Sequence, residues 1–192
     1  QRNYEVEHAF RSSVFQVVSF ITTTGLCSDD AAKWPHVTWV VLAACMFLGG
    51  SSGSTSGGIK SIRGVMLVKI VKNEFRQILH PNAVLPMKID GYNVQMSKRV
   101  TLLAFIGLYL FLAVICAFTM IAAGIDSTNS MTITLSSLGN VGPTLGLEIG
   151  PTMSWNELPD FAKWISSFLM LVGRLELFSV LVLFTPSFWK EN

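Results

Sequence analysis

The chain has 192 residues, of which 51% are hydrophobic and 14% are charged, and its mean hydropathy is +0.50. Soluble domains carry about a quarter charged residues, so this composition excludes an ordinary soluble domain and indicates a protein embedded in lipid. The formal net charge of +2 identifies no partner by itself. Because the chain begins at Gln1 and shows no signal-peptide pattern, we expect it to be an internal or C-terminal part of a longer protein.

Long apolar segments mark the candidate membrane spans. A helix that crosses a bilayer needs about 20 mostly apolar residues. Three segments reach that length, Trp34–Ile59, Val100–Ala123 and Trp164–Trp189. The middle segment carries no charge and is the clearest span. The last segment is apolar except for two charges near its middle, Arg174 and Glu176.

Two shorter uncharged stretches, Ser12–Cys27 and Ser127–Leu147, precede the first and the last of these segments. Each can supply about 10 helical residues, and at about 1.5 Å per residue such a helix reaches only halfway across a bilayer. These stretches therefore predict re-entrant segments, which enter and leave the membrane on one side. The order of a short segment followed by a span occurs twice, which indicates an internal repeat of the kind common in transport proteins.

Charge placement predicts the orientation of the chain. The connection between the first two long segments is rich in basic residues and has only two acidic ones, Glu74 and Asp90. The basic residues are Lys60, Arg63, Lys69, Lys72, Arg76, Lys88, Lys98 and Arg99. By the positive-inside rule, residues 60–99 are cytoplasmic, and so is the C-terminus with its Lys190. The short segments then enter from the outside. Basic residues at the start of this connection also suit a helix end near anionic lipid headgroups.

The two short segments read as pore loops. They run SSVFQVVSFITTTGL over Ser12–Leu26 and MTITLSSLGNVGPTL over Met131–Leu145. Each is a short apolar stretch that ends in a few residues around a glycine, Gly25 in one and Gly142 in the other. Non-helical backbone at membrane depth is tolerated where it lines a watery cavity, and its carbonyl groups can replace the hydration shell of a cation. Neither loop has an acidic side chain, which favours coordination by backbone carbonyls.

Superposing Gly25 on Gly142 aligns the two loops without a gap. Thr23 then corresponds to Asn140 in the second loop. In each loop, the single residue between this position and the glycine corresponds as well. A single Thr/Gly loop is most often only a turn. Two such loops at the same place in two repeats make a shared role in ion coordination the stronger interpretation.

A Gly/Ser run, GGSSGSTSGG over Gly49–Gly58, interrupts the segment Trp34–Ile59. Such runs are usually flexible linkers, but this one has an apolar helix before it and a basic helix after it. A phosphate-binding loop is a further alternative, but Ile59 stands before Lys60 and breaks the required spacing. We therefore predict a polar, non-helical loop at membrane depth, where it would need a watery cavity.

Arg174 is predicted to lie near the middle of the last span, where a charge is costly and usually faces a cavity. Two interpretations stay open at this point. Arg174 either ties the repeats together through backbone carbonyls, or projects into the pore, where it repels cations or holds the Gly/Ser loop.

No catalytic carboxylate, nucleophile or phosphate loop occurs at a credible spacing, so we expect no enzyme activity and no catalytic residue. The three cysteines, Cys27, Cys45 and Cys116, lie far apart and suit small apolar fillers better than disulfide or metal ligands. A membrane enzyme or energised pump is accordingly disfavoured.

Four segments, TTTGL (Thr22–Leu26), GGSSGSTSGGIK (Gly49–Lys60), GNVGPTLG (Gly139–Gly146) and GRLELFSVLVLFTPSFW (Gly173–Trp189), occur in the order seen in a known family. The chain resembles the TrkH/KtrB superfamily of bacterial potassium transporters, and most closely its TrkH branch. This resemblance implies an all-α polytopic membrane protein with four helix–pore loop–helix repeats around a pseudo-fourfold ion pore. The chain would hold the end of the third repeat (1–79), a cytoplasmic connection (80–97) and the fourth repeat (98–192).

The resemblance also implies roles for residues. The ion-binding filter would comprise Thr22, Thr23, Thr24, Gly25, Asn140, Val141 and Gly142. The gate would comprise the loop glycines together with an arginine in the permeation path; these residues are Gly49, Gly50, Gly53, Gly57, Gly58 and Arg174. Potassium at the filter would be the sole metal, with no organic cofactor.

Partners and location follow from the same resemblance. The expected partners are membrane lipid, an N-terminal half with two further repeats, a second copy of the protein, and a cytoplasmic nucleotide-binding regulatory subunit of the TrkA type, with no nucleic acid. The expected location is the bacterial inner membrane. The alternatives are a sodium-permeable or a sodium- or proton-coupled cation transporter of the same superfamily, and a non-conducting assembly subunit.

Overall fold

A computed structural model describes residues 6–51, 53–54, 56–82, 86–89, 91–145, 155–175 and 177–189. Within these ranges the chain is almost entirely helical, with a single small hairpin. The α-helices are α1 (Val6–Ile21), α2 (His36–Leu48), α3 (Ser61–Leu79), α4 (Met96–Ala122), α5 (Ser127–Gly139), α6 (Asp160–Arg174) and α7 (Leu177–Val182). The remaining elements are the 3-10 helices Ala31–Lys33, Trp155–Glu157 and Pro186–Phe188 and the strands β1 (Lys88–Ile89) and β2 (Tyr92–Asn93), which pair antiparallel.

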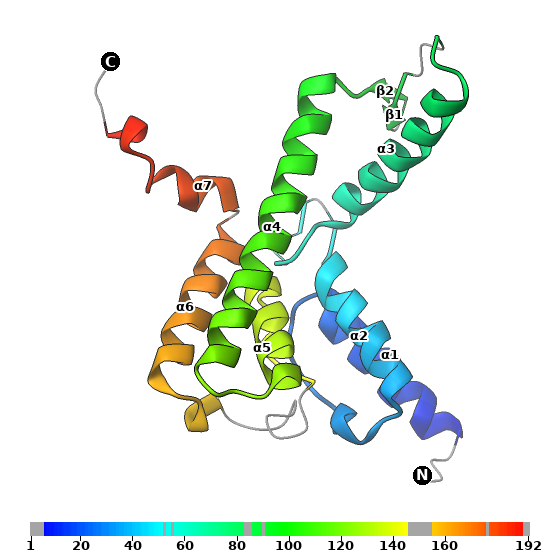
Figure 1. Cartoon of the computed structure of the whole chain (residues 1–192). Coiled ribbons are helices and arrows are strands. Elements are labelled where there is room, and N and C mark those ends of the chain that lie inside the picture. The colour runs from blue at the N-terminus through cyan, green and yellow to red at the C-terminus, as the bar shows by residue number, and fades with distance from the viewer. Residues whose placement is uncertain are drawn as a thin grey trace.

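The helices form two groups that meet at the centre of the molecule (Figure 1). In one group α5 packs against both α4 and α6, and in the other α1 packs against α2. The groups touch where α2 contacts α5. Helix α3 extends away from α2, and the β1–β2 hairpin near its far end leads back into α4. This layout repeats the unit of a short helix, a loop and a longer helical segment.

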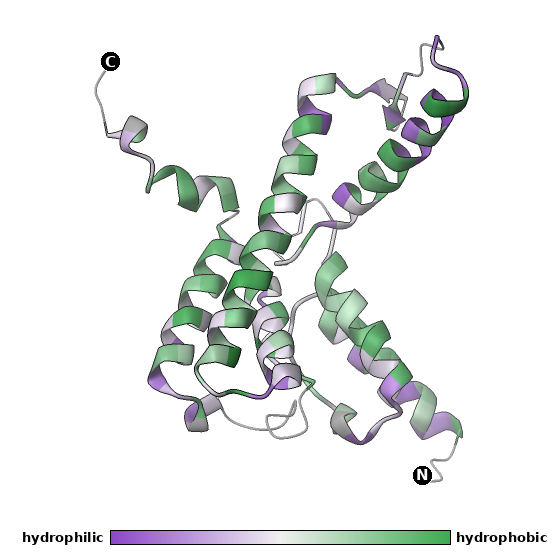
Figure 2. Cartoon of the chain, in the orientation of Figure 1, coloured by the Kyte–Doolittle hydropathy of each residue, from purple (hydrophilic) through white to green (hydrophobic). Residues whose placement is uncertain are grey.

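Helix α4 confirms the clearest predicted span. Its 27 residues reach about 40 Å at about 1.5 Å per residue, and among the described helices it alone is long and apolar enough to cross a membrane. Only 33% of its most apolar window is buried inside the chain. Apolar side chains such as Leu110, Phe111 and Phe118 are exposed along it, and the hydropathy colouring of Figure 2 shows that most of the helix is hydrophobic. This surface suits lipid or another membrane helix.

The other two predicted spans differ from the expectation. Helix α2 ends at Leu48, as the Gly/Ser run required. The segment Trp164–Trp189 was expected to be one span, and this was wrong, because α6 ends at Arg174 and a separate helix, α7, begins at Leu177. Hydropathy averaged over the segment does not reveal that the helix is interrupted, although the interruption coincides with the only charges of the segment. Glu176, like Lys190, lies outside the described residues.

The short helices are somewhat longer than expected but still too short to cross a bilayer. Helix α1 has 16 residues because it begins at Val6, ahead of the uncharged stretch, and α5 has 13. At about 1.5 Å per residue they reach about 24 and 20 Å, against a hydrocarbon core of about 30 Å. The Asp126 carboxylate caps α5 and accepts hydrogen bonds from the backbone N–H groups of Thr128 and Asn129 at 2.9 and 3.4 Å.

Two apolar clusters hold the loops in place. The first joins α4, α5, α6 and α7 through Phe105, Tyr109, Leu138, Leu169, Val172, Leu177 and Val180. The second joins α1 and α2 to the loop that follows α5, through Phe20, Leu42, Met46, Val141 and Leu145. Because the second cluster includes residues from both halves of the chain, it brings the two glycine loops together.

Candidate ion-conducting site

The two glycine loops have the same backbone conformation. Thr23 and Asn140 both have φ of 53°, and they are the only non-glycine residues with positive φ in the described part of the chain. The aligned glycines also have positive φ, 77° at Gly25 and 102° at Gly142. Left-handed conformations are costly for residues with a side chain, so their recurrence at aligned positions reflects a shared loop design.

Hydrogen bonds repeat in the same register. The Thr24 N–H donates to the Ser19 carbonyl at 2.9 Å, and the corresponding Val141 N–H donates to the Ser136 carbonyl at 3.0 Å. One residue earlier, the Thr23 N–H donates to the Phe20 carbonyl at 3.3 Å, and the Asn140 N–H donates to the Ser137 carbonyl at 3.1 Å. These bonds turn the chain sharply at the carboxyl ends of α1 and α5. Each helix therefore directs the negative end of its dipole toward its loop, which favours a cation there.

The loops are in direct contact. A methyl group added to Gly25 would overlap the Val141 carbonyl oxygen and would lie 3.2 Å from Cδ of Pro143. Gly142, by contrast, has none of the described atoms within 4 Å of the corresponding position. The close approach of Gly25 to Val141 and Pro143 therefore places the backbones of the two loops side by side.

Several side chains of the two loops form hydrogen bonds within the protein or are buried. The Asn140 amide donates from Nδ2 to the Met170 carbonyl of α6 at 3.0 Å, and the Val141 side chain is buried. The Thr22 hydroxyl donates to the Val18 carbonyl at 2.7 Å and bonds the Thr24 hydroxyl at 2.8 Å. These loop side chains therefore bond to or pack against other parts of the chain.

The Gly/Ser run forms a closed loop directly beside the glycine loops. The residues at its start and end are joined by backbone hydrogen bonds. The Ile59 N–H donates to the Phe47 carbonyl at 3.0 Å, and the Ser61 N–H donates to the Gly50 carbonyl at 3.0 Å. Inside it, the Gly50 N–H donates to the Ser56 hydroxyl at 3.0 Å. The described residues of the run are thus held in a compact arrangement whose two ends meet.

One hydrogen bond ties this loop to the first glycine loop, since the Gly57 N–H donates to the Thr23 hydroxyl at 3.3 Å. A methyl group on Gly57 would overlap the Gly139 carbonyl and lie 2.9 Å from Cβ of Asn140. Gly49 likewise faces the Gly57 carbonyl without room for a side chain, whereas Gly53 has open space. The predicted gating glycines are therefore not equivalent.

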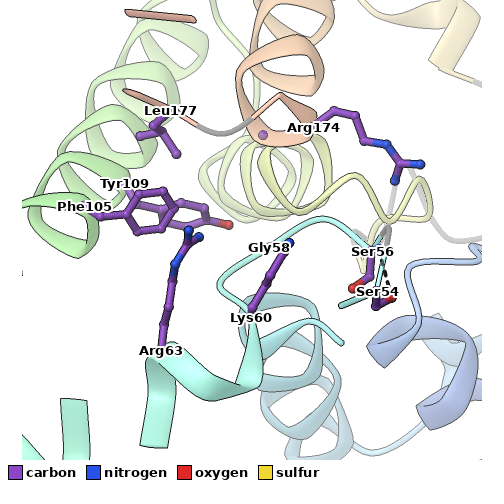
Figure 3. Close-up of a pocket in the computed structure, with 10 residues that line it drawn as sticks. Ser54, Ser56, Gly58, Lys60, Arg63, Phe105, Tyr109, Arg174 and Leu177 are labelled. Carbon is purple, nitrogen blue, oxygen red and sulfur yellow. Dashed lines mark hydrogen bonds between the residues drawn. The ribbon is translucent and has the colours of Figure 1, made fainter. Parts of the chain in front are cut away.

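A cavity of about 210 Å³ lies on the other side of the Gly/Ser loop (Figure 3). The loop contributes Ser54 and Ser56, and basic side chains come from the start of α3 and the end of α6; they are Lys60, Arg63 and Arg174. The aromatic rings of Phe105 and Tyr109, on α4, form one wall. The Arg63 guanidinium lies over the Phe105 ring, 4.0 Å from its centroid, as a cation–π contact.

The structure thus brings several of the predicted site residues together. Thr23, Gly25, Asn140, Val141 and Gly57 lie around one point, and Arg174 lies at the end of α6 on the cavity wall. Lys60 and Arg63 were assigned to the basic connection and were not among the predicted site residues, yet they line this cavity. Their position within the first turn after the Gly/Ser run was the available signal. No sequence pattern pointed to Tyr109. Gly173 begins one of the four family segments but was given no role there; in the structure it lies against the Leu138 carbonyl.

An all-helical chain with a long apolar span and two matched re-entrant loops in contact has the architecture of an ion-transporting membrane protein. The family model for the cation transport protein TrkH matches residues 2–191. The chain belongs to the TrkH family.

Characterised relatives agree with this assignment. The chain is 36% identical over 189 residues to the Trk system potassium uptake protein TrkH of Halomonas elongata, covering 98% of this chain and 39% of that protein. It is 39% identical over 177 residues to TrkH of Escherichia coli K12, covering 92% and 36%. The crystal structure of the potassium transporter TrkH from Vibrio parahaemolyticus superposes with a TM-score of 0.88 at 35% identity, covering 96% of this chain and 39% of that one. The chain therefore spans less than two-fifths of the length of these proteins.

Proposed function

We propose that this chain is part of a potassium translocation subunit of a bacterial Trk-type uptake system. Potassium would pass a filter of backbone carbonyls, of which the chain supplies the strands Thr22–Gly25 and Asn140–Gly142. The observation that carries this proposal is the contact between two loops of equal conformation, at Gly25 and the Val141 carbonyl. The names of the relatives, which are potassium uptake proteins, support potassium as the ion.

Two strands do not surround an ion, so the proposal requires two further repeats outside this chain. An apolar groove of about 740 Å³ supports this requirement. In the second repeat Leu138 packs against α4. The aligned residue of the first repeat, Ile21, instead lines the open groove, together with Leu48, Val65 and Val68. We infer that a helix equivalent to α4, from the beginning of the third repeat, occupies it.

The Gly/Ser loop and Arg174 are proposed to gate the pore. The loop lies against the filter strand at Thr23, and Arg174 lies on the wall of the cavity that the loop bounds. A cation that leaves the filter would have to pass both. We further propose that the basic connection faces the cytoplasm of the bacterial inner membrane, where a TrkA-type regulatory subunit would bind, and that the full protein is a dimer.

The test is ion flux through the full-length protein in proteoliposomes, with and without a shortened Gly49–Gly58 loop. We expect saturable, potassium-selective flux that rises when the loop is shortened, with no ATP hydrolysis by the protein itself. Unchanged flux would sink the gating proposal. Equal permeability to sodium would favour the sodium-permeable alternative, and absent flux in a folded protein would favour a non-conducting assembly subunit.

A further inference from the structure

Tyr109, on α4, has a buried hydroxyl group with no hydrogen-bond partner among the described residues. Its side chain is 1% exposed and lines the cavity beside the Gly/Ser loop. Burial of a polar group without a partner is costly, so nearly all buried polar groups of folded proteins are hydrogen-bonded. The exception at Tyr109 points to a partner that the observed arrangement of the chain does not supply.

The ring of Tyr109 is held between two other aromatic rings. The Phe47 ring meets it edge-on, with 5.6 Å between the centroids and 86° between the ring planes, and the Phe105 ring lies 6.4 Å away. Figure 3 shows the hydroxyl directed away from α4, toward the Gly/Ser loop. Because the ring is fixed on both sides, the hydroxyl stays in the cavity and a partner has to come to it.

The Gly/Ser loop is confined on its filter side and has room on its cavity side. Toward the filter, the Gly57 N–H donates to the Thr23 hydroxyl at 3.3 Å, and a methyl group on Gly57 would overlap the Gly139 carbonyl. On the other side, the loop and Tyr109 line the same cavity of about 210 Å³. A loop that leaves the filter strand therefore has space to move toward Tyr109.

The loop also presents groups that can accept a hydrogen bond from Tyr109. The hydroxyls of Ser54 and Ser56 belong to side chains that line the cavity. Each accepts one backbone bond, from the Ser56 N–H at 3.1 Å and from the Gly50 N–H at 3.0 Å respectively. A hydroxyl oxygen has two lone pairs, so each can accept a second bond. Movement of the loop into the cavity would bring these acceptors toward the Tyr109 hydroxyl.

We propose that Tyr109 is a positioning residue, which holds the Gly/Ser loop in a second, retracted position by donating a hydrogen bond to it. The Thr23 hydroxyl holds the loop against the filter strand, and the Tyr109 hydroxyl holds it away from that strand. Each bond exists in one position only, so the two residues bias one equilibrium in opposite directions. The effect on transport rests on the gating role proposed above, whereas the second position of the loop does not.

The first measurement is potassium flux through the full-length protein in proteoliposomes. Tyr109→Phe removes the hydroxyl and keeps the ring, so we expect flux to fall by up to about fivefold, the change that one hydrogen bond produces in a closed–open ratio. Tyr92→Phe is the matched control, because Tyr92 is 81% exposed on β2. Unchanged or higher flux in Tyr109→Phe, in a protein whose flux responds to loop shortening, would overturn the proposal.

The second measurement is the unfolding temperature of the same variants, which separates a role in loop position from a role in stability. Because the Tyr109 hydroxyl has no partner among the described residues, Tyr109→Phe should unfold at the same temperature as wild type or at a higher one. A lower unfolding temperature would give the hydroxyl a structural role in the observed arrangement and would count against the proposal.

The third measurement follows the loop itself, by double electron–electron resonance between spin labels on Gly53→Cys and Gly107→Cys in a full-length background without other cysteines. A side chain added at either glycine meets none of the described atoms within 4 Å. We expect two label distances, and the shorter one, in which the loop lies nearer α4, should become more populated in Thr23→Val and about fivefold less populated in Tyr109→Phe.

Identical distance distributions in wild type and Tyr109→Phe would refute the retracted position held by Tyr109. If the populations shift as expected while flux stays the same in every variant, the role of Tyr109 stands and the proposed gating function fails.

Discussion

Thr23 and Asn140 share a left-handed backbone conformation, with φ of 53° at each, at aligned positions of two loops that touch one another. The two turns also share their backbone hydrogen bonds. In each loop, the N–H groups of this residue and of the next one donate to carbonyl groups of the preceding helix. In the proposed function, these two loops are two parts of one ion filter. This relationship makes the loop positions directly testable.

The glycines of the two loops should differ in their tolerance of a side chain. Gly25→Ala adds a methyl group that overlaps the Val141 carbonyl and also strains a positive φ. Gly142→Ala meets only the backbone strain, about 1–3 kcal/mol. We expect Gly25→Ala to abolish potassium uptake by the full-length protein in a potassium-limited growth assay, and Gly142→Ala to reduce it. Equal uptake by the two variants would contradict the contact between the loops.

The hydrogen bond from the Gly57 N–H to the Thr23 hydroxyl should help to hold the Gly/Ser loop closed. Thr23→Val keeps the shape of the side chain and removes the acceptor. A net loss of about 1 kcal/mol shifts a closed–open equilibrium about fivefold, so we expect flux to rise by that order in proteoliposomes. Thr22→Val is the matched control, because the Thr22 hydroxyl bonds Val18 and Thr24 rather than the loop. A rise of the same size in both variants would argue against this bond as a latch.

Sequence reasoning located the loops because their signal is local. Short apolar stretches that end in a glycine, and a Gly/Ser run between an apolar and a basic helix, are visible in adjacent residues. The alignment of Gly25 with Gly142 predicted the equivalence that the φ angles of Thr23 and Asn140 confirm. The long uncharged stretch gave α4 nearly to its ends.

Other features depend on tertiary contacts, which no local pattern encodes. The break between α6 and α7 lies where Gly173 packs against the Leu138 carbonyl, and hydropathy alone joined the two helices. Tyr109 looks like one more apolar residue of α4 until its hydroxyl is seen to face the cavity beside Arg63. The cavity itself is formed by elements far apart in the sequence.

Asn140 should stabilise the fourth-repeat strand in two separable ways. Its side chain donates to the Met170 carbonyl at 3.0 Å, and asparagine tolerates the left-handed conformation better than alanine. Asn140→Gly removes only the hydrogen bond, with an expected loss of about 1 kcal/mol. Asn140→Ala adds about 1–2 kcal/mol of backbone strain. Thermal unfolding of the full-length protein should therefore rank wild type above glycine and glycine above alanine. An alanine variant as stable as the glycine variant would refute the backbone contribution.

Replacing Arg174 distinguishes the two roles considered for it. Arg174 ends α6 and lines the cavity that the Gly/Ser loop bounds. If it repels cations or holds the loop, Arg174→Ala should raise potassium flux several-fold and weaken its dependence on cation concentration, while Arg174→Lys, which keeps the charge, should stay close to wild type. If Arg174 instead ties the repeats together, Arg174→Ala should lower both flux and the unfolding temperature. Arg11→Ala is the control, because Arg11 is exposed on α1 and pairs only with Glu7, at 3.6 Å; a surface pair of this kind contributes little.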